Sequence, residues 1–85
     1  MNSYTLILTK KAAKDISKLT PQLKTKLKDI LINKVSKSPY DGKKLVGDLS
    51  GFYSVRLNYQ DRIIYTIDEE TKIVCIHRTR THYGE

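Results

Sequence analysis

The sequence predicts an α+β domain in which an antiparallel sheet carries a hairpin of two helices on one face. Two observations support this class. In the first half of the chain, apolar residues recur with the 3.6-residue spacing of helices, and from Phe52 onward they alternate with the two-residue spacing of half-buried strands. The predicted order of elements is β-α-α-β-β-β. The 85 residues suffice for one domain, 1–85, with a single modest core.

The first half of the chain contains one predicted strand and both predicted helices. Tyr4 to Leu8 is a short apolar run of strand length. Thr9 is a suitable N-cap for the first helix, and Thr20 followed by Pro21 has the residue types of a second helix start. Residues 36–39 end this second helix, and a basic loop follows. The apolar faces comprise Ala12, Ala13, Ile16 and Leu19 in the first helix and Leu23, Leu27, Ile30, Leu31 and Val35 in the second.

The second half predicts a meander of three strands. The first begins at Phe52, the second spans 62–67 and the third spans 72–78, with turns at 58–61 and 68–71. If the first turn holds three residues, Arg56 and Arg62 share a face of the sheet, whereas a slip of one residue would separate them. Because the helices cover one face, the other face is expected to be open.

The charge of the chain favours a polyanionic partner. The formal net charge is +7, and eleven of the twelve lysines lie between Lys10 and Lys44, whereas all four arginines lie in the second half. Lysines on a helix supply diffuse attraction to a nucleic acid, an acidic protein or an anionic membrane surface. A guanidinium instead offers a planar pair of donors that matches a phosphate, so arginines on adjacent strands can converge on one phosphate.

Cysteine usage and hydropathy predict a cytoplasmic protein. Cys75 is the single cysteine, so an intrachain disulfide is impossible, and its apolar neighbours predict a buried thiol. The N-terminus lacks a basic region followed by an apolar stretch, and no window approaches the roughly 20 apolar residues of a membrane span. Neither secretion nor membrane insertion is expected.

The last nine residues, 77–85, contain two histidines, two arginines and a tyrosine at the end of an apolar strand. Cleavage of RNA without a metal requires a proton acceptor for the ribose 2′-hydroxyl, a cation for the charge on phosphorus, and a proton donor for the leaving 5′-oxygen. Histidine, with a reference pKa near ~6.5, can serve in either proton role. The segment therefore has the residue types of a ribonuclease site.

Three stretches of the chain carry a family resemblance. These are Leu49-Ser50-Gly51-Phe52-Tyr53-Ser54, Arg62-Ile63-Ile64-Tyr65 and Arg80-Thr81-His82-Tyr83. As an ordered set they resemble the RelE/YoeB superfamily of toxin–antitoxin endoribonucleases, and the terminal His-Tyr is most similar to the YoeB branch. The resemblance implies the RelE-like microbial RNase fold. It also implies a toxin that cleaves messenger RNA in the ribosomal A site and is silenced by a cognate antitoxin.

The resemblance also assigns roles to individual residues. His82 resembles the family's near-terminal histidine and is the expected proton donor. Arg62 resembles the family arginine that contacts the scissile phosphate, and Arg80 is a second such cation. Tyr83 can stack on a base or bind the phosphate. Arg56 and Arg78 are predicted to position the RNA rather than to act in catalysis. The alternative for these candidates is a structural role without chemistry: a surface residue for Arg62 and Arg80, and a tail residue for His82 and Tyr83.

The general base is where the chain departs from the YoeB pattern, because residues 42–48 contain no glutamate. RelE is more similar here, since it places lysines in this loop. Lys44 is therefore predicted to be catalytic and Lys43 to bind RNA, although either lysine can replace the carboxylate. A lysine acts as a base only if neighbouring cations lower its pKa. Asp48 and Asp61 are the alternatives, and Asp48 has the character of a turn residue.

His77 is predicted to be structural, since it lies within the strand alternation of Cys75 and its neighbours. Cys75 and His77 make only two potential ligands, whereas a zinc site takes three or four. We therefore expect neither a metal nor another cofactor.

The leading prediction is a ribosome-dependent messenger endoribonuclease whose lysine-rich helices bind ribosomal RNA. The antitoxin is expected to be acidic or amphipathic. ParE proteins, which share this fold but inhibit DNA gyrase and lack the terminal His-Tyr, provide the first alternative. A non-catalytic basic RNA-binding module is the second.

Overall fold

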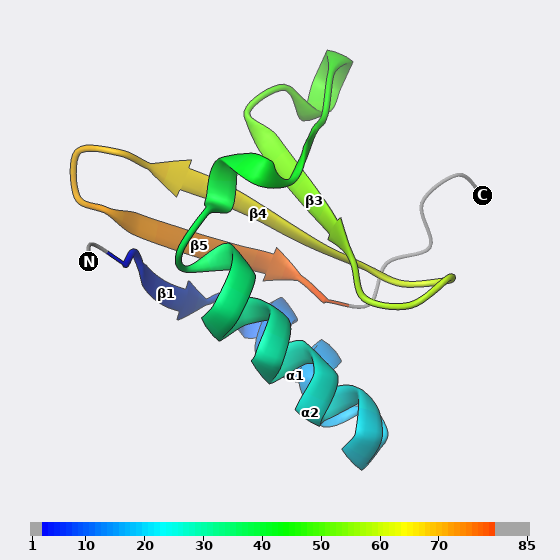
Figure 1. The fold of residues 1–85 in the computed structure, drawn as a ribbon. Helices are drawn as coiled ribbons and strands as arrows, with labels where there is room; N and C mark the ends of the chain where they lie inside the picture. Colours follow the sequence, from blue (N-terminus) through cyan, green and yellow to red (C-terminus); the bar gives the residue numbers. More distant parts are fainter. Residues whose placement is uncertain (1–2, 80–85) are drawn as a thin grey trace.

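The computed structural model describes residues 3–79, which contain the predicted elements in the predicted order and one further short strand, β2 at Lys43–Lys44 (Figure 1). The α+β class is therefore confirmed. The principal helices and strands are β1 at Thr5–Leu8, α1 at Lys10–Ser17, α2 at Pro21–Ile30, β2 at Lys43–Lys44, β3 at Phe52–Arg56, β4 at Arg62–Asp68 and β5 at Ile73–Arg78.

Both helices begin at the predicted threonines. The Thr9 hydroxyl accepts a hydrogen bond from the Ala12 amide at 3.1 Å, and the Thr20 hydroxyl accepts one from the Leu23 amide at 3.2 Å. The second helix reaches Val35 as predicted, but residues 31–35 form a π-helical turn with a wider hydrogen-bond spacing. No helix among residues 3–79 is long and apolar enough to cross a membrane.

The sheet has five strands in the order β1-β5-β4-β3-β2. It is mixed rather than wholly antiparallel, because β1 pairs with β5 in parallel. No hairpin joins these two strands, which come from opposite halves of the sequence, so chain connectivity does not impose an antiparallel pairing. The additional strand β2 pairs with β3 through only two residues, which is too short for a periodic signal in the sequence.

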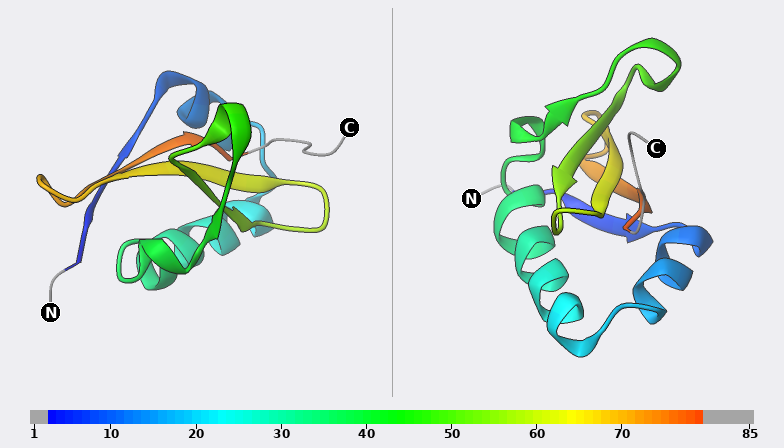
Figure 2. Two further views of the ribbon diagram at one scale, coloured as in Figure 1. Left: turned by 90° about the horizontal axis from the view of Figure 1, so that it is seen from above. Right: turned by 90° about the vertical axis from the view of Figure 1, so that its right-hand side faces the viewer.

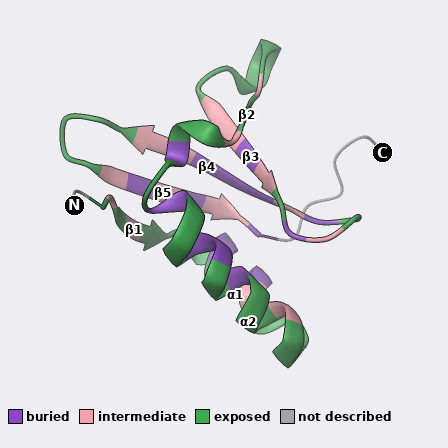
Figure 3. Cartoon of the chain, in the orientation of Figure 1, coloured by how far each residue is buried: buried purple, intermediate pink, exposed green. Residues whose placement is uncertain are grey.

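The core lies between the helices and one face of the sheet, which we call the helical face. Leu27, Ile30 and Val35 of the second helix pack there against Tyr65 and Ile76. Figure 3 shows the buried residues concentrated along the central strands and the inner side of the helices. Ala12 of α1 belongs to the same core, and Figure 2 shows the two helices diverging from the turn that joins them. The expected hairpin is therefore present, but its helices spread apart.

The opposite face of the sheet, which we call the distal face, is not uniformly open. Strand alternation places on it Lys43 of β2, Phe52, Ser54 and Arg56 of β3, Arg62, Ile64 and Thr66 of β4, and Cys75 and His77 of β5. Ser54 and Ile64 at its centre are only 2% and 3% exposed. Cys75 is half-buried rather than fully buried. The positively charged residues occupy the margin of this face.

A hydrogen-bond cluster holds the β4–β5 turn to two distant segments. The carboxylate of Glu69 accepts hydrogen bonds from the Tyr4 hydroxyl at 2.7 Å and the Tyr40 hydroxyl at 2.8 Å, and it pairs with Lys72. These donors, Lys72 foremost, lower the pKa of Glu69 to about 2. The cluster lies at the opposite end of β4 from Arg62.

Candidate functional site

Arg56 and Arg62 are directly opposite each other on β3 and β4. The turn between the strands explains this register. The Leu57 amide donates to the Asp61 carbonyl at 2.9 Å, which leaves residues 58–60 as a three-residue turn. The Asn58 side chain accepts from the Asp61 amide at 2.6 Å and thereby fixes the turn. The prediction that the two arginines share a face is therefore confirmed.

The two predicted lysines are consecutive residues of strand β2, so they lie on opposite faces of the sheet. Lys43 pairs with Ser54, so it shares the distal face with Arg56. Lys44 pairs with Tyr53, which stacks on Tyr65 on the helical face. The sequence assigned catalysis to Lys44 and RNA binding to Lys43. The register places Lys43, and not Lys44, on the same face as the paired arginines.

Gly42 explains why β2 lies so close to the sheet. A methyl group in place of its hydrogen would lie 2.2 Å from the Tyr65 hydroxyl and 3.1 Å from the Ser54 carbonyl oxygen. The Tyr65 hydroxyl donates to the Pro39 carbonyl at 2.6 Å, which keeps it in place. The absence of a side chain at residue 42 therefore permits the pairing that positions Lys43.

Of the two aspartates considered as alternative bases, Asp48 lies in a turn and Asp61 directly follows one. Asp48 is exposed within a short 3-10 turn, Gly47–Leu49, as predicted. Asp61 is buried at 6% exposure, and its carboxylate Oδ2 accepts a hydrogen bond from the Asn58 side-chain Nδ2 at 3.5 Å. Gly51, in the Leu-Ser-Gly segment, has a φ of 95°, a left-handed conformation that favours glycine. The structure thus gives Asp61 and Gly51 roles in local backbone geometry.

His77 lies on the distal face, and its ring is engaged in contacts with its neighbours. Its Nε2 is 3.0 Å from the Thr66 hydroxyl, and its ring lies edge-on to Phe52 with 5.1 Å between centroids. Burial lowers the pKa of His77, which favours the neutral imidazole. Among residues 3–79, no three His, Cys, Asp or Glu side chains come together as ligands for a metal.

Arg78 was predicted to position RNA, but it forms an ion pair with Asp15 of α1. Its Nε donates to Asp15 Oδ2 at 2.8 Å, and its terminal nitrogen donates to Oδ1 at 3.3 Å. The pair raises the pKa of Arg78. No pattern in the sequence marks Asp15 as the partner of Arg78, although it is the single acidic residue of α1. Arg80, His82 and Tyr83 lie outside the residues that the structure describes.

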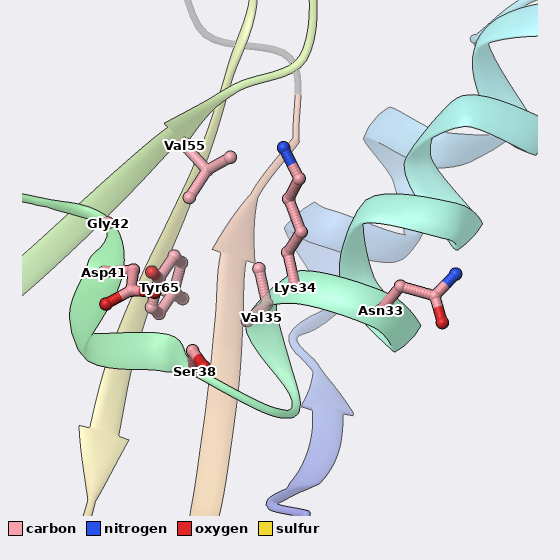
Figure 4. A pocket seen from close by; sticks show the side chains of 8 residues that line it. All are labelled: Asn33, Lys34, Val35, Ser38, Asp41, Gly42, Val55 and Tyr65. Atoms are coloured by element: carbon pink, nitrogen blue, oxygen red, sulfur yellow. The ribbon is translucent and has the colours of Figure 1, made fainter.

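Two hollows lie away from the paired arginines. One of about 340 Å³ opens beside Tyr65, and none of the predicted site residues lines it (Figure 4). Burial raises the pKa of Tyr65 to about 12, so this phenol remains a hydrogen-bond donor. The second hollow, a groove of about 400 Å³, lies between β1 and the helices. Its lining consists of Leu6, Leu8, Ile16, Lys24, Leu27, Lys28, Leu31 and Ile32.

Comparison with known proteins adds three kinds of similarity. The family model described as "ParE-like toxin of type II bacterial toxin-antitoxin system" matches residues 6–83. A Synechocystis protein, Toxin YoeB, is 32% identical over 59 residues, which cover 65% of this chain and 66% of that toxin. The chain thus aligns with about two thirds of this curated relative.

Solved structures of toxins have the same fold. The Mycobacterium tuberculosis RelBE2 toxin–antitoxin complex contains a chain with a TM-score of 0.86 and 31% identity, covering 100% of this chain and 97% of that one. For the E. coli RelBE complex the TM-score is 0.80 and the identity 26%, with coverage of 93% and 96%. An Agrobacterium tumefaciens YoeB/ParE toxin has a TM-score of 0.82 at 22% identity, covers 93% of this chain and 99% of that one, and supports the fold alone.

Proposed function

Because this chain belongs to the ParE-like toxins of type II bacterial toxin–antitoxin systems, within the RelE/YoeB superfamily, we propose that it cleaves messenger RNA in the ribosomal A site. In this reaction the ribose 2′-hydroxyl attacks the adjacent phosphorus without a metal. The observation that carries the proposal is the cationic margin of the distal face, where Arg56 and Arg62 pair and Lys43 occupies the same side.

The described residues supply part of the required chemistry. Arg62 stabilises the charge that develops on the phosphorane, because its guanidinium presents paired donors to phosphate oxygens. Arg56 holds the neighbouring backbone, and Lys43 takes the role of proton acceptor. The proton donor for the 5′-oxygen is His82, and Arg80 and Tyr83 act beside it, as the family resemblance implies. In this assignment Arg78 is a structural partner of Asp15 rather than an RNA contact.

The helices supply the surface that binds the ribosome. Seven lysines on or flanking α1 and α2 are exposed, namely Lys10, Lys11, Lys14, Lys18, Lys24, Lys26 and Lys28. Lysines of this kind bind ribosomal RNA by releasing condensed counterions, so the affinity falls steeply with salt. The ribosome thereby brings the messenger to the distal face.

The partner that silences the toxin is an acidic, amphipathic segment of a cognate antitoxin. The groove between β1 and the helices offers leucine and isoleucine side chains rimmed by Lys24 and Lys28, which complement apolar and acidic residues respectively. Several similar solved structures are toxin–antitoxin complexes.

Gyrase inhibition is the second candidate, because the matching family model is named for ParE. One experiment separates the two functions. The chain is expressed without its antitoxin, and messenger 5′ ends and plasmid supercoiling are measured together. We expect cuts aligned with codons that disappear in His82→Ala. Intact messenger with relaxed plasmid would contradict the ribonuclease proposal and support gyrase as the target.

The neighbouring lysines give a matched test of the site. We expect Lys43→Ala to slow cleavage on programmed ribosomes roughly 100-fold, because it removes a group that acts in proton transfer. Lys44→Ala removes the same charge from the opposite face and should change the rate by no more than about twofold. Single-turnover cleavage rates of the two variants provide the comparison. Equal losses, or a larger loss for Lys44→Ala, would refute the assignment of Lys43.

A further inference from the structure

Tyr59 differs from the other tyrosines that the structure describes, because the fold does not use its side chain. Tyr4 and Tyr40 donate hydrogen bonds through their hydroxyls. The rings of Tyr53 and Tyr65 stack on each other. Tyr59 is 84% exposed, and its side chain makes neither a hydrogen bond nor a ring contact in the part of the chain that is described. A single exposed ring is common on protein surfaces, so its surroundings decide what it can bind.

The turn that carries Tyr59 has a fixed backbone. Tyr59 is the middle residue of the turn 58–60. The side-chain oxygen of Asn58 accepts a hydrogen bond from the Gln60 amide at 2.8 Å and another from the Asp61 amide at 2.6 Å. Figures 1 and 2 show the turn extending beyond the end of β5. Because the turn is already ordered, a ligand that contacts the ring pays little for ordering the backbone.

The two paired arginines flank this turn. Arg56 and Arg62 are each three residues from Tyr59 along the chain. A chain advances at most about 3.6 Å per residue, so each arginine Cα lies within roughly 11 Å of the Tyr59 Cα. The one acidic residue between the arginines, Asp61, is 6% exposed and hydrogen-bonded to Asn58. The turn therefore presents an aromatic ring beside two cations, and this combination binds the bases and the phosphates of single-stranded nucleic acid.

We propose that Tyr59 stacks on an unpaired base of the RNA strand whose phosphate Arg56 and Arg62 bind. The inference rests on the proposed ribonuclease function, because it takes messenger RNA as the ligand of the two arginines. Every base has a π-face, so Tyr59 adds affinity for unpaired nucleotides without selecting a codon. A protein partner fits this position less well. The groove proposed for the antitoxin borders β1, which β5 separates from β4 and its turn.

The test compares Tyr59→Ala with Gln60→Ala, a change at the neighbouring exposed residue of the same turn. The probe is a short, fluorescently labelled single-stranded RNA with 2′-O-methyl groups, which cannot be cleaved by 2′-hydroxyl attack. Anisotropy measures its binding to the purified full chain. We expect Tyr59→Ala to weaken binding at least about fivefold, and Gln60→Ala and Tyr59→Phe to change it less than about twofold. The loss should disappear on a duplex of the same sequence, because its bases are already stacked and paired.

The salt dependence of binding separates stacking from charge. In Arg56→Ala the slope of log affinity against log salt should decrease in magnitude by about 0.7, as expected for one lost phosphate contact, whereas Tyr59→Ala should leave the slope unchanged. A reduced slope in Tyr59→Ala, an equal loss on the duplex, or failure of the wild-type chain to bind the single strand would overturn the inference. Equal affinities of Tyr59→Ala and Gln60→Ala would also overturn it and indicate the antitoxin as the partner of this turn.

The two proposals can fail separately, because the probe reports binding without cleavage. A wild-type chain that binds the single strand through Tyr59 but leaves messenger intact on ribosomes would support stacking and refute only the cleavage of messenger. A chain that cleaves messenger, but whose binding of the single strand does not depend on Tyr59, would refute only the stacking.

Discussion

Arg62→Ala is expected to lower the rate of messenger cleavage on the ribosome by about 100- to 1,000-fold, which is the usual effect of removing one donor to a transition-state oxyanion. Arg62 begins β4 on the distal face, opposite Arg56. Its loss removes a cation from the developing phosphorane while leaving the strand pairing intact. Single-turnover cleavage of messenger in programmed ribosomes measures the effect.

Arg56→Ala is the matched control, because it removes the same group from the opposite strand. It should raise KM by roughly tenfold or less and leave kcat nearly unchanged, as expected for a residue that positions the RNA backbone. Arg62→Lys should recover little activity, since an ammonium lacks the planar pair of donors. Equal kcat losses for the two alanine variants would contradict the separate roles given to the arginines.

Gly42→Ala is expected to destabilise the folded protein by about 1–3 kcal/mol, the usual cost of overpacking. The new methyl group would meet the Tyr65 hydroxyl at 2.2 Å, and this hydroxyl cannot move without losing its hydrogen bond to the Pro39 carbonyl. For a domain of this size, each 1 kcal/mol lowers Tm by about 4–8 °C. Thermal unfolding measures this loss directly.

The clash of an alanine at residue 42 can also be relieved by a change at Tyr65. Tyr65→Phe removes the hydroxyl that the methyl group meets, so Gly42→Ala should cost less stability in a Tyr65→Phe background than in the wild type. A double-mutant cycle by urea denaturation yields this coupling. Purely additive effects would show that the contact between residue 42 and Tyr65 is not what limits the close approach of β2.

Local signals predicted much of the fold. Thr9 and Thr20 begin their helices as predicted because a capping hydroxyl acts on a backbone amide three residues away. The shared face of Arg56 and Arg62 followed from the length of one turn. The parallel pairing of β1 with β5 left no such signal, because it joins residues 68 positions apart, as in Thr5 with Ile73.

The sequence did not predict which of the two candidate lysines shares a face with the arginines, or which candidate residue forms an ion pair. Lys43 and Lys44 are chemically equivalent neighbours, and only the pairing of β2 distinguishes their faces. Asp15 lies on a basic amphipathic helix, where an acidic residue usually indicates a solvated position. Its contact with Arg78 spans 63 residues and depends on how α1 meets the end of β5. Tertiary packing, rather than local propensity, decides these assignments.

The position of β5 in the sheet has a consequence for synthesis of the chain. β5 lies between β1 and β4, so the first strand has no neighbour in the sheet until residues 73–78 have been translated. Such non-local pairings also fold slowly, because a long loop must close before its contacts form. A growing chain therefore cannot complete the five-stranded sheet before β5 has been made.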